Sequence, residues 1–225
     1  MSRTSRPDLY GLFGHPVSHS LSPRIHKRFA QQTGQDLRYI AVDVAAGEFN
    51  HEAEQFHRSG GLGLNVTLPY KAEAAALADE LTGRASTVGV EKTLLWREDG
   101  ALVGDNTDGA GLVTDLTRNI GFDLADVRVL LMGAGGAASG SLAPLLAEAP
   151  AEIVVANRTV ERAEQLADRH RGIAPSYPSS YRDLEGSFDL VINATSASLE
   201  GDVPPLPPTA VRPDTLCYDM LYGSE

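Results

Sequence analysis

Short apolar runs alternate with longer amphipathic segments along most of the chain, and this alternation predicts the secondary structure. A short apolar run is typical of a strand buried on both faces of a sheet, whereas spaced apolar positions are typical of a helix. Strands are predicted over residues 8–14, 37–44, 61–67, 92–97, 101–104, 127–132, 152–156, 188–193 and 215–219. Helices are predicted over residues 23–34, 48–59, 81–88, 109–120, 137–149 and 160–170, and from residue 69 onward. Such alternation favours an α/β fold.

A glycine-rich turn lies at the most apolar of these strand-to-helix junctions. A buried strand leads directly into Gly133, Gly135 and Gly136, and a helix of small residues follows. Such a turn lets a pyrophosphate approach the backbone, and the helix N-terminus offers N–H groups and a partial positive charge. The third glycine of the usual fingerprint is replaced by Ala138, which the fingerprint allows. The sequence predicts a dinucleotide-binding loop; the alternative is a plain turn that needs glycine for a positive φ.

The next strand ends in residues that favour NADP over NAD. An NAD enzyme usually has an acidic residue here for the ribose hydroxyls. This chain has Asn157, Arg158 and Thr159, with Arg162 one helical turn later. Guanidinium groups bind a 2′-phosphate, whereas a carboxylate would repel it. The alternative is that both arginines are surface charges of the helix over residues 160–170.

Polar side chains gather at two junctions in the first half of the chain. Ser20 and Ser22 lie in a serine-rich loop after the first predicted strand, and Ser22 is placed to act as a helix N-cap. Asn65, Thr67 and Lys71 lie where the third predicted strand meets a helix. The carboxyl ends of strands are where open α/β sheets bind ligands. The alternatives are a capping loop without a ligand and a solvated surface lysine.

Composition narrows the class of protein. The chain has 225 residues, which allows one or two domains, and a net charge of −11, which argues against nucleic acid or an anionic membrane as a main partner. Cys217 is the single cysteine, so no intramolecular disulfide forms and a cytoplasmic location is expected. Neither a membrane-spanning run nor a secretory signal is recognisable, and no metal site is predicted.

Several of these segments, taken together, resemble the shikimate dehydrogenase family. The matching segments are SHSLSP (18–23), NVTLPYK (65–71), GDNTDG (104–109), GAGGA (133–137), NRT (157–159), NATS (193–196) and YDMLY (218–222). They follow one another in the family's order and cover nearly the whole chain. The lysine and aspartate motifs are specific in combination, whereas the glycine loop alone is not.

The resemblance implies a two-domain NADP-dependent oxidoreductase. A substrate-binding and catalytic α/β domain is expected over residues 1–108 and a Rossmann-like NADP-binding domain over residues 109–225, with the active site in the cleft between them. The implied reaction interconverts 3-dehydroshikimate and shikimate on the route to chorismate and the aromatic amino acids. A dehydrogenase of quinate or a related cyclitol acid, and a catalytically impaired NADP-binding paralogue, are the alternatives. A small-molecule substrate and a monomeric or homodimeric state are expected.

The resemblance also assigns roles to residues. Lys71 and Asp108 match the family's catalytic pair. Contact with the substrate is implied for Ser20, Ser22, Asn65, Thr67, Lys92 and Tyr222. Contact with the cofactor is implied for Gly133, Ala134, Gly135, Gly136, Ala137, Asn157, Arg158, Thr159, Arg162, Thr195 and Met220.

The chain departs from the family pattern in two places. Lys92 stands where the family usually has an asparagine that binds the substrate. An ammonium group only donates hydrogen bonds, and a second charge beside Lys71 should lower the pKa of Lys71. Alternatively, Lys92 pairs with Glu91 or the substrate carboxylate, or faces solvent. The sequence also stops at Glu225, where family members continue, so we expect folded sheets with impaired catalysis and exposed apolar surface.

Overall fold

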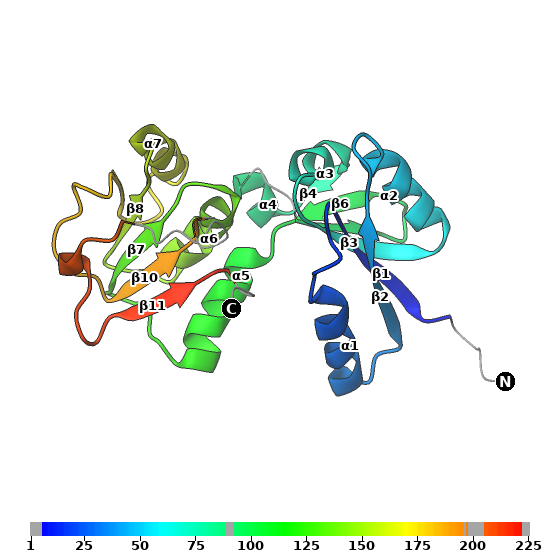
Figure 1. The fold of residues 1–225 in the computed structure, drawn as a ribbon, viewed down its shortest axis with the longest axis horizontal. Helices are drawn as coiled ribbons and strands as arrows, with labels where there is room; N and C mark the ends of the chain where they lie inside the picture. Colours follow the sequence, from blue (N-terminus) through cyan, green and yellow to red (C-terminus); the bar gives the residue numbers. More distant parts are fainter. Residues whose placement is uncertain (1–5, 89–91, 196, 198–204, 222–225) are drawn as a thin grey trace. The chain divides into compact units, whose positions relative to one another are not determined.

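The structure, a computed structural model, describes residues 6–88, 92–195, 197 and 205–221. The chain separates into two compact units, residues 1–106 and 107–225, and Figure 1 shows the sheet and helices of each. The division lies just before the boundary predicted at residue 108. Both units combine a sheet with helices, which confirms the predicted α/β class.

The first unit is built on a six-stranded sheet with the strand order β2-β1-β3-β5-β6-β4. Its elements are β1 (Asp8–Gly14), α1 (Ser22–Thr33), β2 (Leu37–Asp43), α2 (Phe49–Arg58), β3 (Gly61–Val66), α3 (Lys71–Leu77), β4 (Glu80–Leu81), α4 (Gly83–Val88), β5 (Thr93–Trp96) and β6 (Leu102–Asp105). β1 is parallel to β2 and β3, whereas β5 is antiparallel to β3 and β6. The carboxyl ends of β1 and β3 therefore lie side by side.

An aromatic core fixes the beginning of α3. Phe13 and Phe49 are almost completely buried, and Tyr70 stacks on Phe49 with 5.3 Å between the ring centroids. The hydroxyl of Tyr70 also donates a 2.7 Å hydrogen bond to the backbone oxygen of Val44. Because Tyr70 is held by both contacts, the following residue, Lys71, projects from an anchored position.

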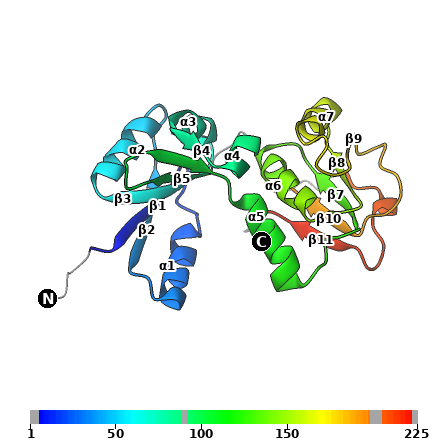
Figure 2. The ribbon, with the colours of Figure 1, turned by 180° about the vertical axis from the view of Figure 1, so that it is seen from behind.

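The second unit has a five-stranded, fully parallel sheet with the order β11-β10-β7-β8-β9 (Figure 2). Its elements are α5 (Asp108–Thr114), η1 (Asp115–Ile120), β7 (Arg128–Met132), α6 (Gly136–Ala147), β8 (Glu152–Ala156), α7 (Val160–Arg169), β9 (Ser176–Ser179), β10 (Leu190–Asn193), η3 (Pro208–Ala210) and β11 (Leu216–Asp219). β7 packs against two different core clusters, one containing Val129 and Leu131 and the other Leu130 and Met132. Burial on both faces explains its uninterrupted apolar sequence.

Two predicted helix starts are wrong. Ser22 is not an N-cap: it is the first residue of α1, which follows Leu21 without a side-chain cap. The hydroxyl of Ser20 accepts the N–H of Ser22 instead, at 3.2 Å. The helix predicted from residue 69 begins at Lys71, because a turn precedes it in which the N–H of Tyr70 bonds to the backbone of residue 67.

Three other differences concern residue 81, residues 115–120 and β9. Leu81 was predicted to be helical but belongs to β4, where it pairs with Gly104. The helix predicted over residues 109–120 changes at Asp115 into the π-helical turn η1. β9 was not predicted, because its sequence, SYPS, has no apolar run; it forms by pairing with β8 at the edge of the sheet.

Candidate functional site

The serine-rich loop is tied to the end of β2 by a carboxylate. Asp43 accepts a hydrogen bond from the ring of His15 and a 3.4 Å bond from the backbone N–H of Val17. The bond from His15, more than any other cause, lowers the pKa of Asp43. Ser20 donates its own N–H to the backbone oxygen of Val17 at 3.0 Å. The loop that carries Ser20 and Ser22 is therefore held at the carboxyl end of β1.

Asn65 joins three strands through its side chain. Its Oδ1 accepts a 2.7 Å hydrogen bond from the hydroxyl of Tyr39 on β2. Its Nδ2 donates to Oγ1 of Thr93 on β5 at 3.0 Å and faces the backbone oxygen of Lys92 at 3.5 Å. The amide is half-buried and held in one orientation.

Thr67 fixes the chain just beyond β3. Its N–H donates a 2.9 Å hydrogen bond to the backbone oxygen of Phe13. Its methyl group packs against Gly14, where an added Cβ would lie 2.3 Å from Cγ2 of Thr67. Glycine at position 14 therefore lets the chains after β1 and β3 approach closely, just before the serine-rich loop and α3.

The side chains of Lys71 and Lys92 lie close enough for each to shift the pKa of the other. Burial lowers the pKa of Lys71, and the interaction with Lys92 opposes this. Burial also lowers the pKa of Lys92, to about 7, with the positive charge of Lys71 as the next cause. The expected fall in the pKa of Lys71 is present, but its main cause is burial. Repulsion between the two positive charges lowers the pKa of Lys92 instead.

The structure thus brings the predicted residues of the first unit to one edge of its sheet. Ser20 and Ser22 follow the carboxyl end of β1, while Asn65, Thr67 and Lys71 follow or end β3. Lys92 joins them because the antiparallel pairing of β5 with β3 sets Thr93 opposite Asn65. The carboxyl end of a strand in such a sheet is where ligands bind.

The glycine turn of the second unit begins directly after β7. Gly133 has a φ of +104°, and an added Cβ would lie 3.1 Å from the backbone oxygen of Ala194 and 3.2 Å from Cγ2 of Thr195. The next residues, Ala134 and Gly135, lead into α6. Its N-cap residue, Gly135, has no side chain that could accept a hydrogen bond from the first turn of the helix. Gly136 and Ala137 form the first turn of this helix. Backbone N–H groups there are available to an anion.

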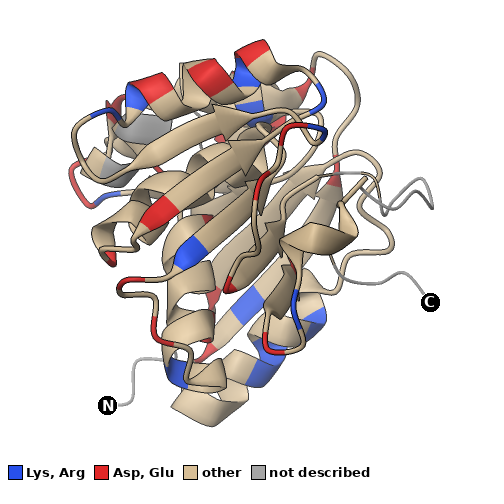
Figure 3. Cartoon of the chain, turned by 90° about the vertical axis from the view of Figure 1, so that its left-hand side faces the viewer, with Lys and Arg blue, Asp and Glu red and all other residues tan. Residues whose placement is uncertain are grey.

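Arg158 and Arg162 are exposed at the start of α7. Asn157 donates a 2.8 Å hydrogen bond to the backbone oxygen of Thr159, which shapes the turn before the helix. Figure 3 shows that α7 carries both basic and acidic residues. Within the described part of the chain, neither arginine takes part in an ion pair. Arg171, just after the end of the same helix, pairs with Asp168.

A polar network lies at the carboxyl ends of β10 and β11, beside the glycine turn. Asn193 donates to Asp219 at 3.0 Å and accepts from the N–H and hydroxyl of Thr195, at 3.1 and 2.7 Å. Met220 donates its N–H to the backbone oxygen of Asn193 at 3.0 Å. Thr195 and Met220 therefore have fixed positions at the same edge as Gly133.

Two predicted residues stand apart from these groups. Asp108 is the first residue of α5 and belongs to the second unit, whereas Lys71 belongs to the first. Their pairing stays a prediction. Tyr222 lies outside the described residues.

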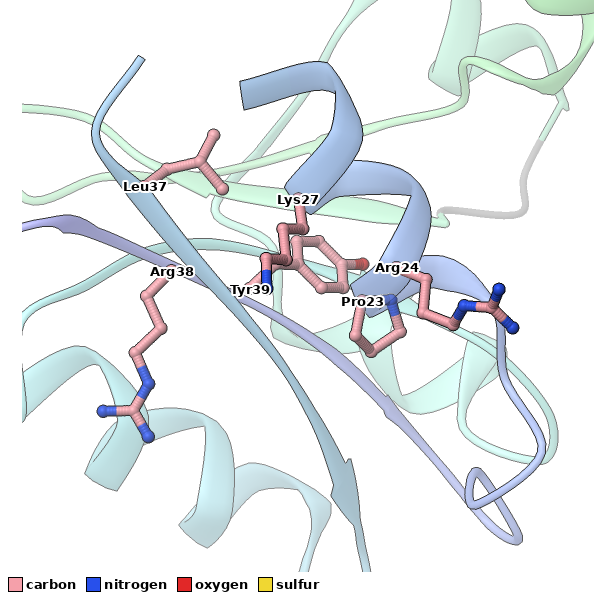
Figure 4. A pocket seen from close by; sticks show the side chains of 6 residues that line it. All are labelled: Pro23, Arg24, Lys27, Leu37, Arg38 and Tyr39. Atoms are coloured by element: carbon pink, nitrogen blue, oxygen red, sulfur yellow. The ribbon is translucent and has the colours of Figure 1, made fainter. Parts of the chain in front are cut away.

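Sequence reasoning missed Tyr39, whose hydroxyl orients Asn65. Tyr39 also lines a hollow of about 380 Å³ between α1 and β2, together with Pro23, Arg24, Lys27, Leu37 and Arg38 (Figure 4). Figure 4 shows the guanidinium groups of Arg24 and Arg38 pointing away from each other, so they do not converge on one anion. The signal in the sequence was a polar hydroxyl in a strand that also contains the apolar residues Ile40 and Val42.

Among the described residues, no helix has the length and apolar character needed to cross a membrane, and no group of His, Cys, Asp or Glu is arranged to hold a metal ion.

Two family profiles match the chain. Residues 12–94 match the substrate-binding domain of shikimate dehydrogenase, and residues 115–200 match shikimate/quinate 5-dehydrogenase. The NADP⁺-dependent shikimate dehydrogenase of Aeromonas salmonicida is 52% identical over 217 residues, which are 96% of this chain and 79% of the relative.

Solved structures of related enzymes resemble this chain in fold and in sequence. An Ael1 enzyme from Pseudomonas putida has 41% identity and a TM-score of 0.87, covering 96% of this chain and 79% of its own. A shikimate dehydrogenase solved in complex with NADP⁺ has 32% identity and a TM-score of 0.83, covering 96% of this chain and 77% of its own.

Proposed function

The chain belongs to the shikimate dehydrogenase family, and from this premise we propose that it interconverts 3-dehydroshikimate and shikimate with NADP, on the route to chorismate. The observation that carries the proposal is Lys71, a partly buried amine whose pKa is lowered, at the start of α3 just beyond β3, the strand that carries Asn65. A general acid–base group for a ring hydroxyl needs such a location and such a pKa.

The residues of the second unit fit a dinucleotide. At Gly133 an added Cβ would press on the backbone of residue 194, and the φ of +104° is one that other residues rarely adopt. The turn therefore requires glycine at this position. The uncapped N-terminus of α6 suits a pyrophosphate. Arg158 and Arg162, without ion pairs among the described residues, would hold the 2′-phosphate of NADP. When bound, NADPH supplies the hydride for the ring carbonyl.

Lys71 handles the proton in this proposal. In the direction of reduction, its ammonium form donates a hydrogen bond to the ring carbonyl and gives up a proton to the forming hydroxyl. In oxidation, the neutral amine takes that proton back. Burial lowers the pKa of Lys71, which increases the neutral fraction near neutral pH. Asp108 is proposed as the carboxylate that orients the amine.

Ser20, Ser22, Thr67, Lys92 and Tyr222 are proposed to contact the substrate. Support for the first four comes from their place at the carboxyl edge of β1 and β3. Lys92 adds a donor where the family has an amide, and this favours a carboxylate or carbonyl acceptor over a hydroxyl donor at its end of the site.

We further propose that the protein works in the cytoplasm as a monomer or a homodimer. Its single cysteine, Cys217, is exposed and has no second cysteine for an intramolecular disulfide, which fits a reducing compartment. Light scattering coupled to gel filtration gives the oligomeric state.

Product identification tests the proposed function. The protein is incubated with NADPH and either 3-dehydroshikimate or 3-dehydroquinate, and the products are separated and weighed by mass spectrometry. Formation of shikimate from 3-dehydroshikimate, at a higher kcat/KM than quinate from 3-dehydroquinate, is expected. Faster formation of quinate contradicts the proposed substrate, and no turnover of either contradicts the proposed enzyme.

A further inference from the structure

The amide of Asn65 has a settled orientation. A backbone oxygen only accepts hydrogen bonds, so the group that faces the backbone oxygen of Lys92 at 3.5 Å must be the nitrogen of Asn65. The nitrogen also donates to Oγ1 of Thr93 at 3.0 Å. The amide oxygen then faces the hydroxyl of Tyr39, which donates to it at 2.7 Å.

Tyr39 is itself held in place. The parallel register of β2, β1 and β3 puts Tyr39, Leu12 and Asn65 on the same face of the sheet. The ring of Tyr39 stacks on His26 of α1, with centroids 4.0 Å apart and planes 3° from parallel. Figure 4 shows the Tyr39 ring extending from β2 towards α1. The hydroxyl therefore reaches Asn65 from a fixed ring.

These bonds decide what Asn65 has left to offer. A primary amide has two N–H donors and two acceptor lone pairs. Both N–H groups of Asn65 are directed at Thr93 and the backbone of Lys92, and Tyr39 takes one lone pair. The remaining capacity is one lone pair on the amide oxygen. A ligand group that meets Asn65 must therefore donate a hydrogen bond.

We propose that Tyr39 is a positioning residue that makes Asn65 a hydrogen-bond acceptor, so that the site selects a substrate with a donating hydroxyl at this point. The inference rests on the proposed function and assigns opposite polarities within one site: an acceptor at Asn65 and N–H donors on the amines of Lys71 and Lys92. A cyclitol acid with a hydroxyl beside the reacting carbonyl offers both partners.

The test uses Tyr39→Phe, which removes the donating hydroxyl and keeps the ring stacked on His26. Affinities for shikimate and for analogues that each lack one ring hydroxyl are measured by calorimetric titration. In the wild type, loss of the hydroxyl that meets Asn65 weakens binding. In Tyr39→Phe that penalty should shrink by about 3- to 10-fold, the range that one neutral hydrogen bond covers. In steady-state kinetics, Tyr39→Phe should raise the KM for shikimate by a larger factor than it lowers kcat.

Two controls separate this role from general damage. Tyr177→Phe removes an exposed tyrosine hydroxyl from β9 of the second unit and should leave every ratio unchanged. Asn65→Ala should abolish discrimination at the same hydroxyl, and Tyr39→Phe should then add nothing further to the discrimination. This cycle also gives an answer if Tyr39→Phe is somewhat less stable.

The outcomes are distinct. The proposal is supported if Tyr39→Phe reduces the loss of affinity caused by removing one ring hydroxyl, and if the same substitution has no such effect in the Asn65→Ala background. Wild-type ratios in Tyr39→Phe overturn the role of Tyr39 while leaving the proposed function intact. A wild-type protein that binds no shikimate overturns both.

Discussion

The contact between α5 and α6 leads to a sharp prediction about Gly109. An added Cβ there would lie 2.2 Å from the backbone oxygen of Gly140, 2.7 Å from Cγ of Pro144 and 3.0 Å from Cα of Ser141. Two of these three atoms belong to the backbone, so no side-chain rotation relieves the clash. Gly109→Ala therefore has to push the two helices apart.

The size of the effect follows from this geometry. Overpacking of this kind costs about 1–3 kcal/mol. Gly111 lies in the same helix with nothing within 4 Å of its added Cβ, so it is the matched control. Gly111→Ala should gain about 0.5–1 kcal/mol, because alanine favours a helix over glycine. The two variants should differ by about 1.5–4 kcal/mol, or about 3–16 °C in Tm for a chain of this length.

The clash also bears on function, because Gly109 follows Asp108, the proposed partner of Lys71. A displacement of about 1 Å in a catalytic group can lower turnover about 100-fold. Thermal unfolding by circular dichroism and initial rates of NADPH oxidation are measured for both variants. Gly109→Ala should lose stability and turnover, and Gly111→Ala should keep its turnover. Equal stability and full turnover in both variants would refute the close packing of α5 on α6.

Three further predictions address other parts of the account. Arg158→Ala combined with Arg162→Ala should weaken NADP much more than NAD in a fluorescence titration; equal wild-type affinity for the two cofactors contradicts the assignment. Burial and the charge of Lys71 lower the pKa of Lys92 to about 7, below the unfolded value, so the unfolded chain binds more protons from about pH 7 to about pH 10. The wild type should therefore gain stability relative to Lys92→Met across that window, and a constant difference in unfolding free energy would speak against it. Tyr70→Phe should cost about 1–3 kcal/mol in denaturant unfolding, since it leaves the buried oxygen of Val44 without its donor; no loss would show that another group takes the donor's place.

Much of the fold could be predicted because most strands of the second unit consist mainly of apolar residues. Val129, Leu131, Leu130 and Met132 are buried in turn on both faces, and such a run is recognisable without its neighbours. The sequence SYPS of β9 carries no such pattern, and only pairing with β8 makes it a strand.

In the candidate site, too, some features could be predicted from local sequence and others depend on strand pairing. Asn65, Thr67 and Lys71 lie close together in the sequence, so their gathering at one edge could be predicted. The contacts of Asn65 with Tyr39 and Thr93 depend on strand order and register, which join residues 26 and 28 positions apart. The mutual effect of Lys71 and Lys92 on their pKa values likewise depends on the antiparallel return of β5 beside β3. Local sequence patterns contain no information about such pairings.

The role of Lys71 as the residue that transfers the proton is the central claim, and one comparison tests it most directly. The kcat for NADPH-dependent reduction of 3-dehydroshikimate is measured for the wild type and for Lys71→Ala, with the Kd of shikimate measured alongside. The account predicts a fall in kcat of about 10²–10⁴-fold, because that is what general acid–base catalysis typically contributes, with a much smaller change in Kd. An unchanged kcat with only a raised KM would contradict it and would make Lys71 a binding residue.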